Sequence, residues 1–390
     1  MPQPAPHSRF SSASGRLGIV GTYPPKLCGL ATFAAALAGA LRTTGYRVDV
    51  VRIDDGDGSS ALPGTVSGDL VNGSRRSVLD AAAVLSRCDV AVVQHEFGIY
   101  GGLDGAEVVD LMRALTVPSI VTLHTVPVGP TAHQKLVLEQ VVELADRVVV
   151  MSATAGERLV SHYEVDGSKV AIVPHGASAP TPSVWEMDEV DSVRPQLLTW
   201  GLLGPGKGIE HAIDALALID PALRPRYTVA GVTHPKVLAQ FGDRYRQSLI
   251  ARCHEVGVAR WVNFDDTYRT VAQLMRFVAS ASVVVLPYDS RDQVTSGVLV
   301  DAIAAGRPVI ATAFPHALEL LGSGAGILVP HADPVALADA IRSVVLHPGV
   351  ADAMATAARR LAPELSWATI ASQYGDLADD AVATLERVAI

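Results

Sequence analysis

The chain has 390 residues, of which 49% are hydrophobic and 18% are charged, and its formal net charge is −9. This apolar content excludes a disordered chain and suffices for the cores of two domains. The negative charge disfavours a nucleic-acid partner, because proteins that bind nucleic acids are usually basic. Residues 1–15 are rich in proline and serine, and we predict a disordered tail there, not a signal peptide.

The cysteines Cys28, Cys88 and Cys253 are scattered and form no C-x-x-C pair. This pattern indicates neither a disulfide framework nor a zinc site, and it favours a reduced, cytoplasmic protein. No apolar run approaches the roughly 18 residues of a membrane span. The local basic cluster Arg75-Arg76 is short, so peripheral contact with a membrane is not indicated.

Short runs of β-branched residues alternate with helical patterns in the first half of the chain. The runs occupy residues 17–22, 47–53, 89–96, 118–125, 146–152 and 169–176. They are continuously apolar, which is typical of parallel strands buried on both faces, and helical patterns such as 31–44 and 131–145 separate them. We therefore predict a doubly wound, Rossmann-like domain over residues 16–180.

A second set of strands follows residues 181–195, which we interpret as a linker because they contain prolines and acids without a period. These strands are predicted at 197–200, 227–231, 261–264, 282–288, 308–313 and 326–330, with helices such as 208–219 and 334–346. We predict a second Rossmann-like domain over residues 196–365, and a helix over 366–390 that returns to the first domain. A cleft between two such domains is the expected ligand site.

The stretch GLLGPGKG, residues 201–208, lies between a predicted strand and a predicted helix. A glycine-rich turn at a helix N-terminus lets backbone N–H groups approach an anion, and Lys207 adds a full positive charge. The stretch matches a Walker A loop except that Gly208 replaces the Ser or Thr that holds Mg²⁺. We therefore favour a phosphate site that is not that of an ATPase. The alternative is an ordinary glycine turn with an exposed lysine.

A second motif, QVTSGVLVDAIAAGRPVIAT, covers residues 293–312. A helix is predicted to begin at Ser296-Gly297 and to end at Gly306, so its N-terminus points toward the carboxyl edge of the sheet. Asp301 lies on its second turn, where a carboxylate can accept hydrogen bonds from a ribose diol. The alternative for Asp301 is a solvated helix residue.

Together with four further motifs, these two resemble the retaining glycosyltransferases of family 4, which have the GT-B fold of two Rossmann-like domains facing a cleft. The further motifs are TYPPKLCGLATF (22–33), VTLHT (121–125), VVMSATAGERL (149–159) and VPHG (173–176). Each motif alone is weakly specific, but the six occur in the family's order. The resemblance extends over residues 16–375.

The resemblance implies a role for each matching position. Lys207 would hold the diphosphate of a nucleotide sugar, Asp301 would bind the ribose, and His124 would lie beside the donor sugar. Gly29, with the adjacent Leu30, would offer backbone amides to the donor phosphate. The other positions expected to bind the donor are Gly206, Arg291, Ser296, Gly297 and Val298.

The sequence departs from the family pattern at three of these positions. Leu202 stands where the family has an arginine, and Arg291 is the candidate replacement for that phosphate cation, with a surface arginine as the alternative. Gln293 stands where the family has a glutamate, and the second glutamate is shortened to Asp301. Because an amide can still hydrogen-bond a sugar hydroxyl, Gln293 joins His124 and Lys207 as a catalytic candidate.

The segment QHEFGIYGG, residues 94–102, follows a strand of the first domain, and we interpret it as the acceptor side. Its candidate residues are His95, Glu96, Gly101 and Gly102. The alternative is a loop at a strand end with a buried histidine.

These observations predict a retaining glycosyltransferase that moves a hexose from a nucleotide sugar to the hydroxyl of a sugar, glycoside or small-molecule acceptor. GDP-mannose and UDP-glucose both fit as donors. No cofactor or metal is expected, and we interpret the D-x-D at Asp55-Gly56-Asp57 as a solvated turn. The alternatives are a non-catalytic GT-B protein that binds a nucleotide or a partner, and a P-loop-like ATPase.

Overall fold

The computed structural model describes residues 15–388 except 57, 59–63, 179–193 and 268. Its contacts divide the chain into two units, one of Met1–Gly176 with Trp367–Ile390 and one of Ala177–Ser366. Residues 1–14 of the predicted tail, 181–193 of the predicted linker and Asp57 lie outside the described residues.

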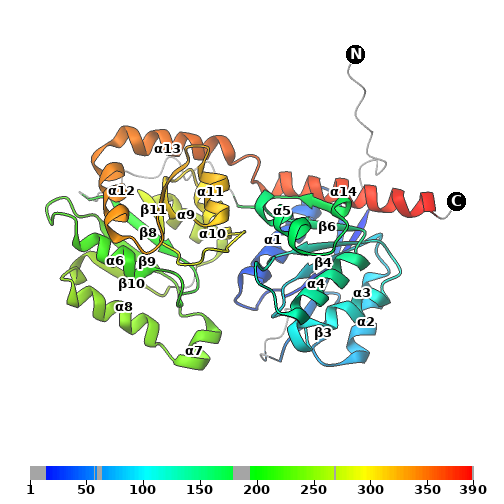
Figure 1. Ribbon diagram of the computed structural model, residues 1–390. Coiled ribbons are helices and arrows are strands. Elements are labelled where there is room, and N and C mark those ends of the chain that lie inside the picture. The colour runs from blue at the N-terminus through cyan, green and yellow to red at the C-terminus, as the bar shows by residue number, and fades with distance from the viewer. Residues whose placement is uncertain (1–14, 57, 59–63, 179–193, 268, 389–390) are drawn as a thin grey trace, which may run out of the picture. The chain divides into compact units, whose positions relative to one another are not determined.

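The first unit is built on a seven-stranded parallel sheet in the order β3-β2-β1-β4-β5-β6-β7. Its strands are β1 (Arg16–Gly21), β2 (Arg47–Asp54), β3 (Gly68–Val71), β4 (Val90–His95), β5 (Ser119–Leu123), β6 (Arg147–Val150) and β7 (Val170–Ile172). Its helices are α1 (Gly29–Thr43), α2 (Arg75–Leu85), α3 (Glu107–Ala114), α4 (Ala132–Leu144), α5 (Ala153–His162) and α14 (Trp367–Val388) (Figure 1).

Six of these seven strands coincide with the apolar runs of the sequence, but β3 was not predicted. In its sequence GDLV only Leu70 is buried, because β3 pairs on one side only, with β2. An edge strand of four residues with a single core side chain leaves no apolar run to find.

The C-terminal helix α14 packs on α1 and over β4 and β5. Ile370 and Ala371 of α14 join the apolar core that also contains Leu37 of α1. The buried hydroxyl of Tyr374 lies 2.7 Å from the Thr122 hydroxyl of β5, in hydrogen-bond contact. The helix therefore belongs to the first unit.

The second unit has a six-stranded parallel sheet in the order β10-β9-β8-β11-β12-β13. The strands are β8 (Gln196–Trp200), β9 (Arg226–Ala230), β10 (Val262–Asp265), β11 (Val283–Leu286), β12 (Val309–Thr312) and β13 (Gly326–Val329). The helices are α6 (Ile209–Ala217), α7 (Pro235–Phe241), α8 (Arg244–Glu255), α9 (Val271–Ser280), α10 (Gly297–Ala304), α11 (Pro315–Leu321), α12 (Pro334–Leu346) and α13 (Pro348–Leu361).

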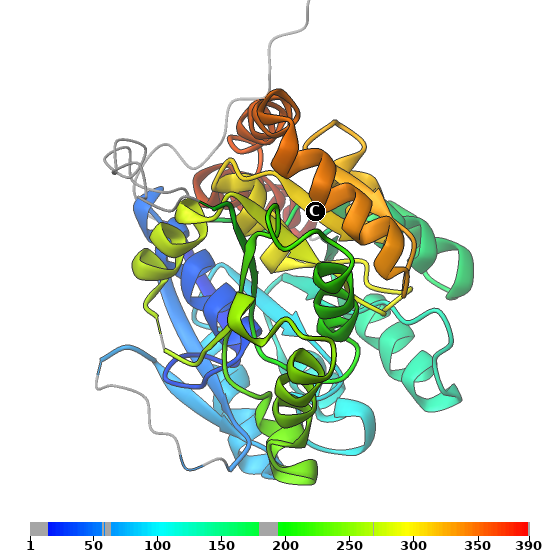
Figure 2. The same ribbon diagram turned by 90° about the vertical axis from the view of Figure 1, so that its left-hand side faces the viewer.

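Helices cover both faces of this second sheet (Figure 2). Val284 and Leu286 of β11 join one apolar core with α9, α10 and α11, while Val283 and Val285 join another with α6, α8 and α12. A strand whose alternate side chains enter two cores must be apolar throughout, which explains the continuous runs in the sequence. The two parallel sheets confirm the predicted fold class.

Each sheet has a switch point beside its first strand, where the order of strands reverses. The switch lies between β1 and β4 in the first unit and between β8 and β11 in the second. Open parallel sheets bind ligands at the carboxyl ends of the strands that flank such a point. The loops of interest are therefore residues 22–28 and 96–106 in the first unit, and 201–208 and 287–296 in the second. No helix in the described parts of the chain is long and apolar enough to span a membrane.

Candidate active site

Residues 201–208 form the loop that leads from β8 into α6, and we call it the phosphate loop. Within it, the Lys207 N–H donates to the Gly204 carbonyl at 3.2 Å. Helix α6 begins at Ile209, and no side chain in the described part of the protein caps its N-terminus. The first backbone N–H groups of an uncapped helix are left for water or an anion.

Gly208 has a backbone conformation and surroundings that only glycine tolerates. Its φ is +60°, in the left-handed region. A Cβ at this position would lie 1.8 Å from the Pro287 carbonyl oxygen. The Ser or Thr of a Walker A loop therefore does not fit, which argues against the ATPase alternative on geometric grounds.

Lys207 is the cation of the phosphate loop. Its Nζ lies 4.4 Å from the centre of the Tyr288 ring. The side chain is only half-buried by surface area, yet it is closely surrounded, and this desolvation lowers the pKa of its ammonium group. No carboxylate among the described residues forms an ion pair with it.

The start of α10 is held by a network of hydrogen bonds behind it. The Ser296 side chain accepts from the Leu299 N–H at 3.3 Å and so caps the helix. The ring of the buried His316 accepts from the Ser296 N–H at 2.9 Å through Nδ1, and the backbone N–H of His316 donates to the Gln293 carbonyl at 3.3 Å. The Gln293 side chain donates to the Thr295 carbonyl at 3.1 Å. No motif marks His316, so the sequence alone does not predict its role.

Asp301 lies one turn into α10, and burial raises the pKa of its carboxyl group to about 7. Its surface area makes it partly exposed, so the dense surroundings, not complete enclosure, cause this shift. The start of α10 also approaches the phosphate loop, because a Cβ on Gly201 would lie 3.8 Å from the Val298 side chain. The structure thus brings the two predicted donor-binding segments together.

Arg291, the predicted replacement for the missing phosphate cation, is exposed. Another cation, Arg246 of α8, donates to the Gly231 carbonyl at 3.0 Å, just after β9. Gly231 is closely apposed to the phosphate loop, since a Cβ there would lie 1.9 Å from the Gly201 carbonyl oxygen. Arg246 was missed because its place at this edge depends on how α8 packs, and no local pattern reports that.

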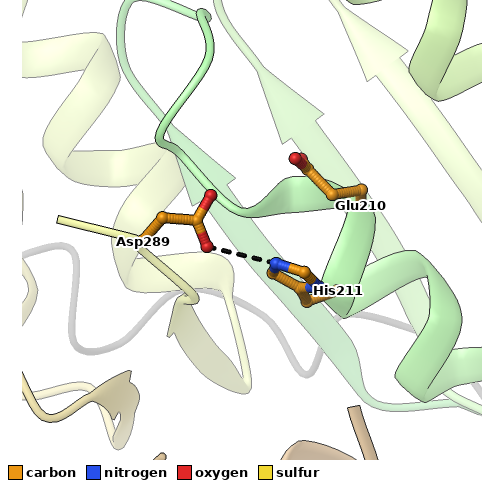
Figure 3. A group of neighbouring side chains, drawn as sticks. All are labelled: Glu210, His211 and Asp289. Carbon is orange, nitrogen blue, oxygen red and sulfur yellow. Dashed lines mark hydrogen bonds and ion pairs between the residues drawn. The ribbon is translucent and has the colours of Figure 1, made fainter. Parts of the chain in front are cut away.

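Glu210, His211 and Asp289 gather beside the phosphate loop, as Figure 3 shows, with ligand-type atoms within 4.8 Å of one another. His211 Nε2 and Asp289 Oδ1 are 3.1 Å apart, and Glu210 accepts from the Tyr245 hydroxyl at 3.0 Å. These contacts account for the cluster, and we assign no metal to it. An open cavity of about 530 Å³ adjoins it, lined by Pro205, Gly206, Glu210, Tyr245, Ser248, Leu249, Arg252 and Asp289.

In the first unit, α1 begins at Gly29, directly after the loop that follows β1. The Cys28 thiol accepts from the Ala31 N–H at 3.3 Å and caps the helix. A Cβ on Gly29 would meet nothing within 4 Å, so the space beside this helix start is open. Leu30 is half-buried on the same turn.

His124 follows β5 and is held by groups of neighbouring elements. Its Nε2 lies 2.7 Å from Gln94 Oε1 of β4, and its ring meets the Phe33 ring edge-on at 4.9 Å. The pKa of His124 is lowered to about 3, mainly by desolvation and to a smaller extent by the nearby His175 and His95 rings. At neutral pH the ring is uncharged and suits hydrogen bonds with hydroxyl groups.

The acceptor-side candidates lie around the end of β4. His95 is buried, neither of its ring nitrogens has a hydrogen-bond partner within the described chain, and desolvation lowers its pKa to about 4. The Glu96 carboxylate accepts from the Thr125 hydroxyl. Gly101 and Gly102 shape the following loop: Gly102 has φ of +79°, and a Cβ on Gly101 would lie 2.5 Å from the Glu107 carboxylate.

Comparisons with known proteins identify the family and the fold of the chain. The model of "Glycosyltransferase Family 4" matches residues 28–179, and that of "Glycosyl transferases group 1" matches residues 194–347. The chain belongs to glycosyltransferase family 4. Relatives in this family include proteins named D-inositol 3-phosphate glycosyltransferase. The one from Streptomyces avermitilis is 30% identical, and the match covers 61% of this chain and 52% of the relative. The one from Corynebacterium glutamicum is 26% identical, and the match covers 70% of this chain and 68% of the relative.

The chain spans about half the length of several of these curated relatives, including those of Streptomyces avermitilis and Geodermatophilus obscurus. Among solved structures, Anabaena HepE in complex with UDP has a TM-score of 0.74 at 18% identity, over 93% of this chain and 98% of its own. Sucrose-phosphate synthase from Thermosynechococcus elongatus has a TM-score of 0.75 at 20% identity, and the match covers 95% of this chain and 100% of the synthase chain. These structures show that the family 4 chain has the GT-B fold.

Proposed function

We propose that the protein transfers a hexose from a nucleotide sugar to an acceptor hydroxyl, with retention of the anomeric configuration and without a metal ion. The observation that carries this proposal is the pairing of two segments at the second switch point. The phosphate loop presents Lys207 and an uncapped helix N-terminus, and the start of α10, with Asp301 one turn further, lies against it.

Each of these groups has a task in the transfer. The leaving nucleoside diphosphate gains negative charge as the bond to the sugar breaks, and fixed dipoles and cations stabilise that charge. Lys207 and the N–H groups at the start of α6 and α10 supply them, with Arg291 as a further candidate. Asp301 binds the ribose, because an ionised carboxylate accepts hydrogen bonds from both hydroxyls.

Polar groups of both units suit the sugar and the acceptor. His124 is uncharged, so it hydrogen-bonds the donor hexose without competing for its phosphates. Gln293 of the second unit takes the place of a carboxylate and hydrogen-bonds a sugar hydroxyl. His95 and Glu96 are the candidates for the acceptor hydroxyl, since the buried ring nitrogens of His95 have no hydrogen-bond partner among the described residues.

Relatives and structural neighbours suggest which ligands to test first. Anabaena HepE has been solved with UDP-glucose, which supports that donor type, and GDP-mannose remains the second candidate. The relatives named D-inositol 3-phosphate glycosyltransferase make a cyclitol phosphate the first acceptor to test, followed by simple sugars and glycosides.

The test is to incubate the protein with UDP-glucose or GDP-mannose and a panel of acceptors, and to measure release of UDP or GDP. The anomeric proton of the product, read by NMR, reports the stereochemistry. We expect turnover with retained configuration, and loss of turnover in Lys207→Ala. An inverted product would reject the mechanism.

A second function, nucleotide binding without catalysis, is favoured by Leu202 and Gln293, which replace a cation and a carboxylate of the family pattern. It predicts tight binding of a nucleoside diphosphate in a titration, but no release of nucleotide from either donor with any acceptor in the panel.

A further inference from the structure

The segment Pro287-Tyr288-Asp289, between β11 and α10, holds the phosphate loop at three consecutive residues. The Pro287 carbonyl fills the space where Gly208 lacks a side chain. The Tyr288 ring lies beneath the Lys207 ammonium at 4.4 Å, and the Asp289 N–H donates to the Gly206 carbonyl at 3.0 Å. We call this segment the platform.

The Tyr288 ring is itself immobilised within the second unit. Only 1% of its surface is exposed, and it stacks on the Phe314 ring at 5.4 Å with an angle of 26° between the rings. Phe314 precedes α11 and is fully buried. The ring beneath the Lys207 ammonium group therefore has a fixed position.

Lys207 needs such a support because its ammonium group is closely surrounded and has no carboxylate partner among the described residues. Desolvation disfavours the charged form, and only the charged form attracts a phosphate strongly. The negative face of an aromatic ring attracts an ammonium group, most strongly where water is scarce. The ring compensates part of the desolvation and leaves the ammonium N–H donors available to an anion.

We propose that Tyr288 is a positioning residue that keeps Lys207 charged and aimed at the donor diphosphate. This inference rests on the proposed function, in which Lys207 binds that diphosphate. The titratable groups on the elements around Lys207 include Glu210 and His211 of α6, Asp289 of the platform, Asp301 of α10 and His234 at the start of α7. The pKa of His234 is lowered mainly by desolvation, then by the charge of Lys236, and least by the charge of Lys207.

The test compares two rings of nearly equal shape at position 288, phenylalanine and a trifluorinated phenylalanine, in the full chain. Fluorine withdraws electrons and removes the negative face of the ring without emptying the site. The probe is UDP, titrated by calorimetry from about pH 7 to about pH 10, a range that approaches the ordinary pKa of lysine.

We expect Tyr288→Phe to bind UDP like the wild type, and the fluorinated variant to bind it about 2- to 30-fold more weakly, the range that cation–π interactions span. The alkaline fall in binding should also move to lower pH in the fluorinated variant, because its Lys207 loses the proton sooner. A role that is only structural would leave this pH dependence unchanged.

Equal UDP binding and equal pH dependence for the two rings would overturn the inference. The Lys207→Ala variant separates this failure from failure of the proposed function. If Lys207→Ala weakens UDP binding while the two rings at position 288 behave alike, only the role of Tyr288 is refuted. If Lys207→Ala binds UDP as the wild type does, the role of Lys207 itself is refuted.

A further measurement needs no substitution in the platform. The ring current of Tyr288 should shift the terminal CH₂ protons of Lys207 upfield in the NMR spectrum, and an ordinary position for that signal would contradict the geometry.

Discussion

The loops at the second switch point carry a lysine and two helix N-termini, whereas histidines that burial keeps neutral lie at or after the carboxyl ends of β4, β5 and β7 in the first unit. Desolvation is the main cause that lowers the pKa of His95, His124 and His175, to about 4, 3 and 4. Apart from the additional strand β7, the two sheets have the same strand order, so the difference lies in the side chains. One scaffold thus offers positive charge in one unit and uncharged hydrogen-bonding groups in the other, which suits a donor diphosphate and a sugar respectively.

The two units differ most strongly at the glycines where the first helix of each unit begins. Gly208→Ala places a Cβ against the Pro287 carbonyl in a left-handed backbone conformation, while Gly29→Ala meets open space. We expect Gly208→Ala to lower the free energy of unfolding by about 2–5 kcal/mol, from backbone strain and overpacking together. Gly29→Ala should change it by less than about 0.5 kcal/mol. Urea unfolding of both variants measures this, and equal stability would contradict the close approach of Pro287.

The charge difference between the sites is tested by Lys207→Ala with His124→Ala as its counterpart. A hydrogen bond to a charged group contributes roughly 1.5–3 kcal/mol, so Lys207→Ala should weaken UDP binding by about 10- to 150-fold. His124→Ala should leave the binding of UDP unchanged and weaken that of UDP-glucose, because only the latter carries the hexose. Calorimetric titration of each variant with both ligands is the measurement. Equal losses for the two ligands in His124→Ala would remove that residue from the sugar site.

The sequence predicted most of the fold because buried parallel strands are continuously apolar. It also located the N-terminus of α10 at Ser296-Gly297, since a serine before an apolar helical pattern is a strong start signal. It missed β3, an edge strand whose single buried residue is Leu70. Local pattern therefore suffices where a strand forms a longer apolar run, as at the edge strand β7, and fails at β3, whose four residues begin with Gly-Asp.

The candidate site was predictable only in part, for a related reason. Lys207 and Asp301 stand in recognisable motifs, but the platform that holds Lys207 comes from a loop about eighty residues further along the chain. Gly208 departs from the Walker pattern in the sequence, and only the approach of Pro287 explains why. Arg246 and His316 act through contacts between separate elements, which no local spacing reports.

A smaller effect is expected at Asp301, the one acid among the donor-binding candidates. Its pKa is raised from the ordinary value of 3.8 to about 7, so the folded protein retains a proton that the unfolded chain releases. Its contribution to stability is therefore present below about pH 4 and lost as the pH rises through about 7. Asp301→Asn cannot ionise, so without ligand it should melt about 2–4 °C above the wild type at about pH 8, the shift that roughly 1 kcal/mol gives in a domain of this size.

The same variant should bind UDP more weakly, because an amide cannot accept hydrogen bonds from the ribose as a carboxylate does. Melting curves at about pH 4 and about pH 8, with the wild type as control, test the first expectation, and a UDP titration tests the second. A higher melting temperature that persists unchanged at about pH 4 would show that burial of the charge is not the cause.

The smallest effects are expected from metal removal and from Asp55→Ala. In the structure the Asp55 carboxylate pairs with Lys26 in a partly exposed loop, and pairs of this kind contribute about 0–1 kcal/mol. Asp57, the other acid of the D-x-D, lies outside the described residues.

If Lys207 and the N-termini of α6 and α10 neutralise the leaving diphosphate, a divalent ion has no charge left to balance there. Turnover of the wild type should then survive a chelator, and Asp55→Ala should match the wild type in rate and in melting temperature. The absence of an arginine at Leu202 makes this a demanding test, because a metal is the natural substitute for a missing cation. Activity that falls with the chelator and returns with Mg²⁺ or Mn²⁺ would reject the metal-free mechanism.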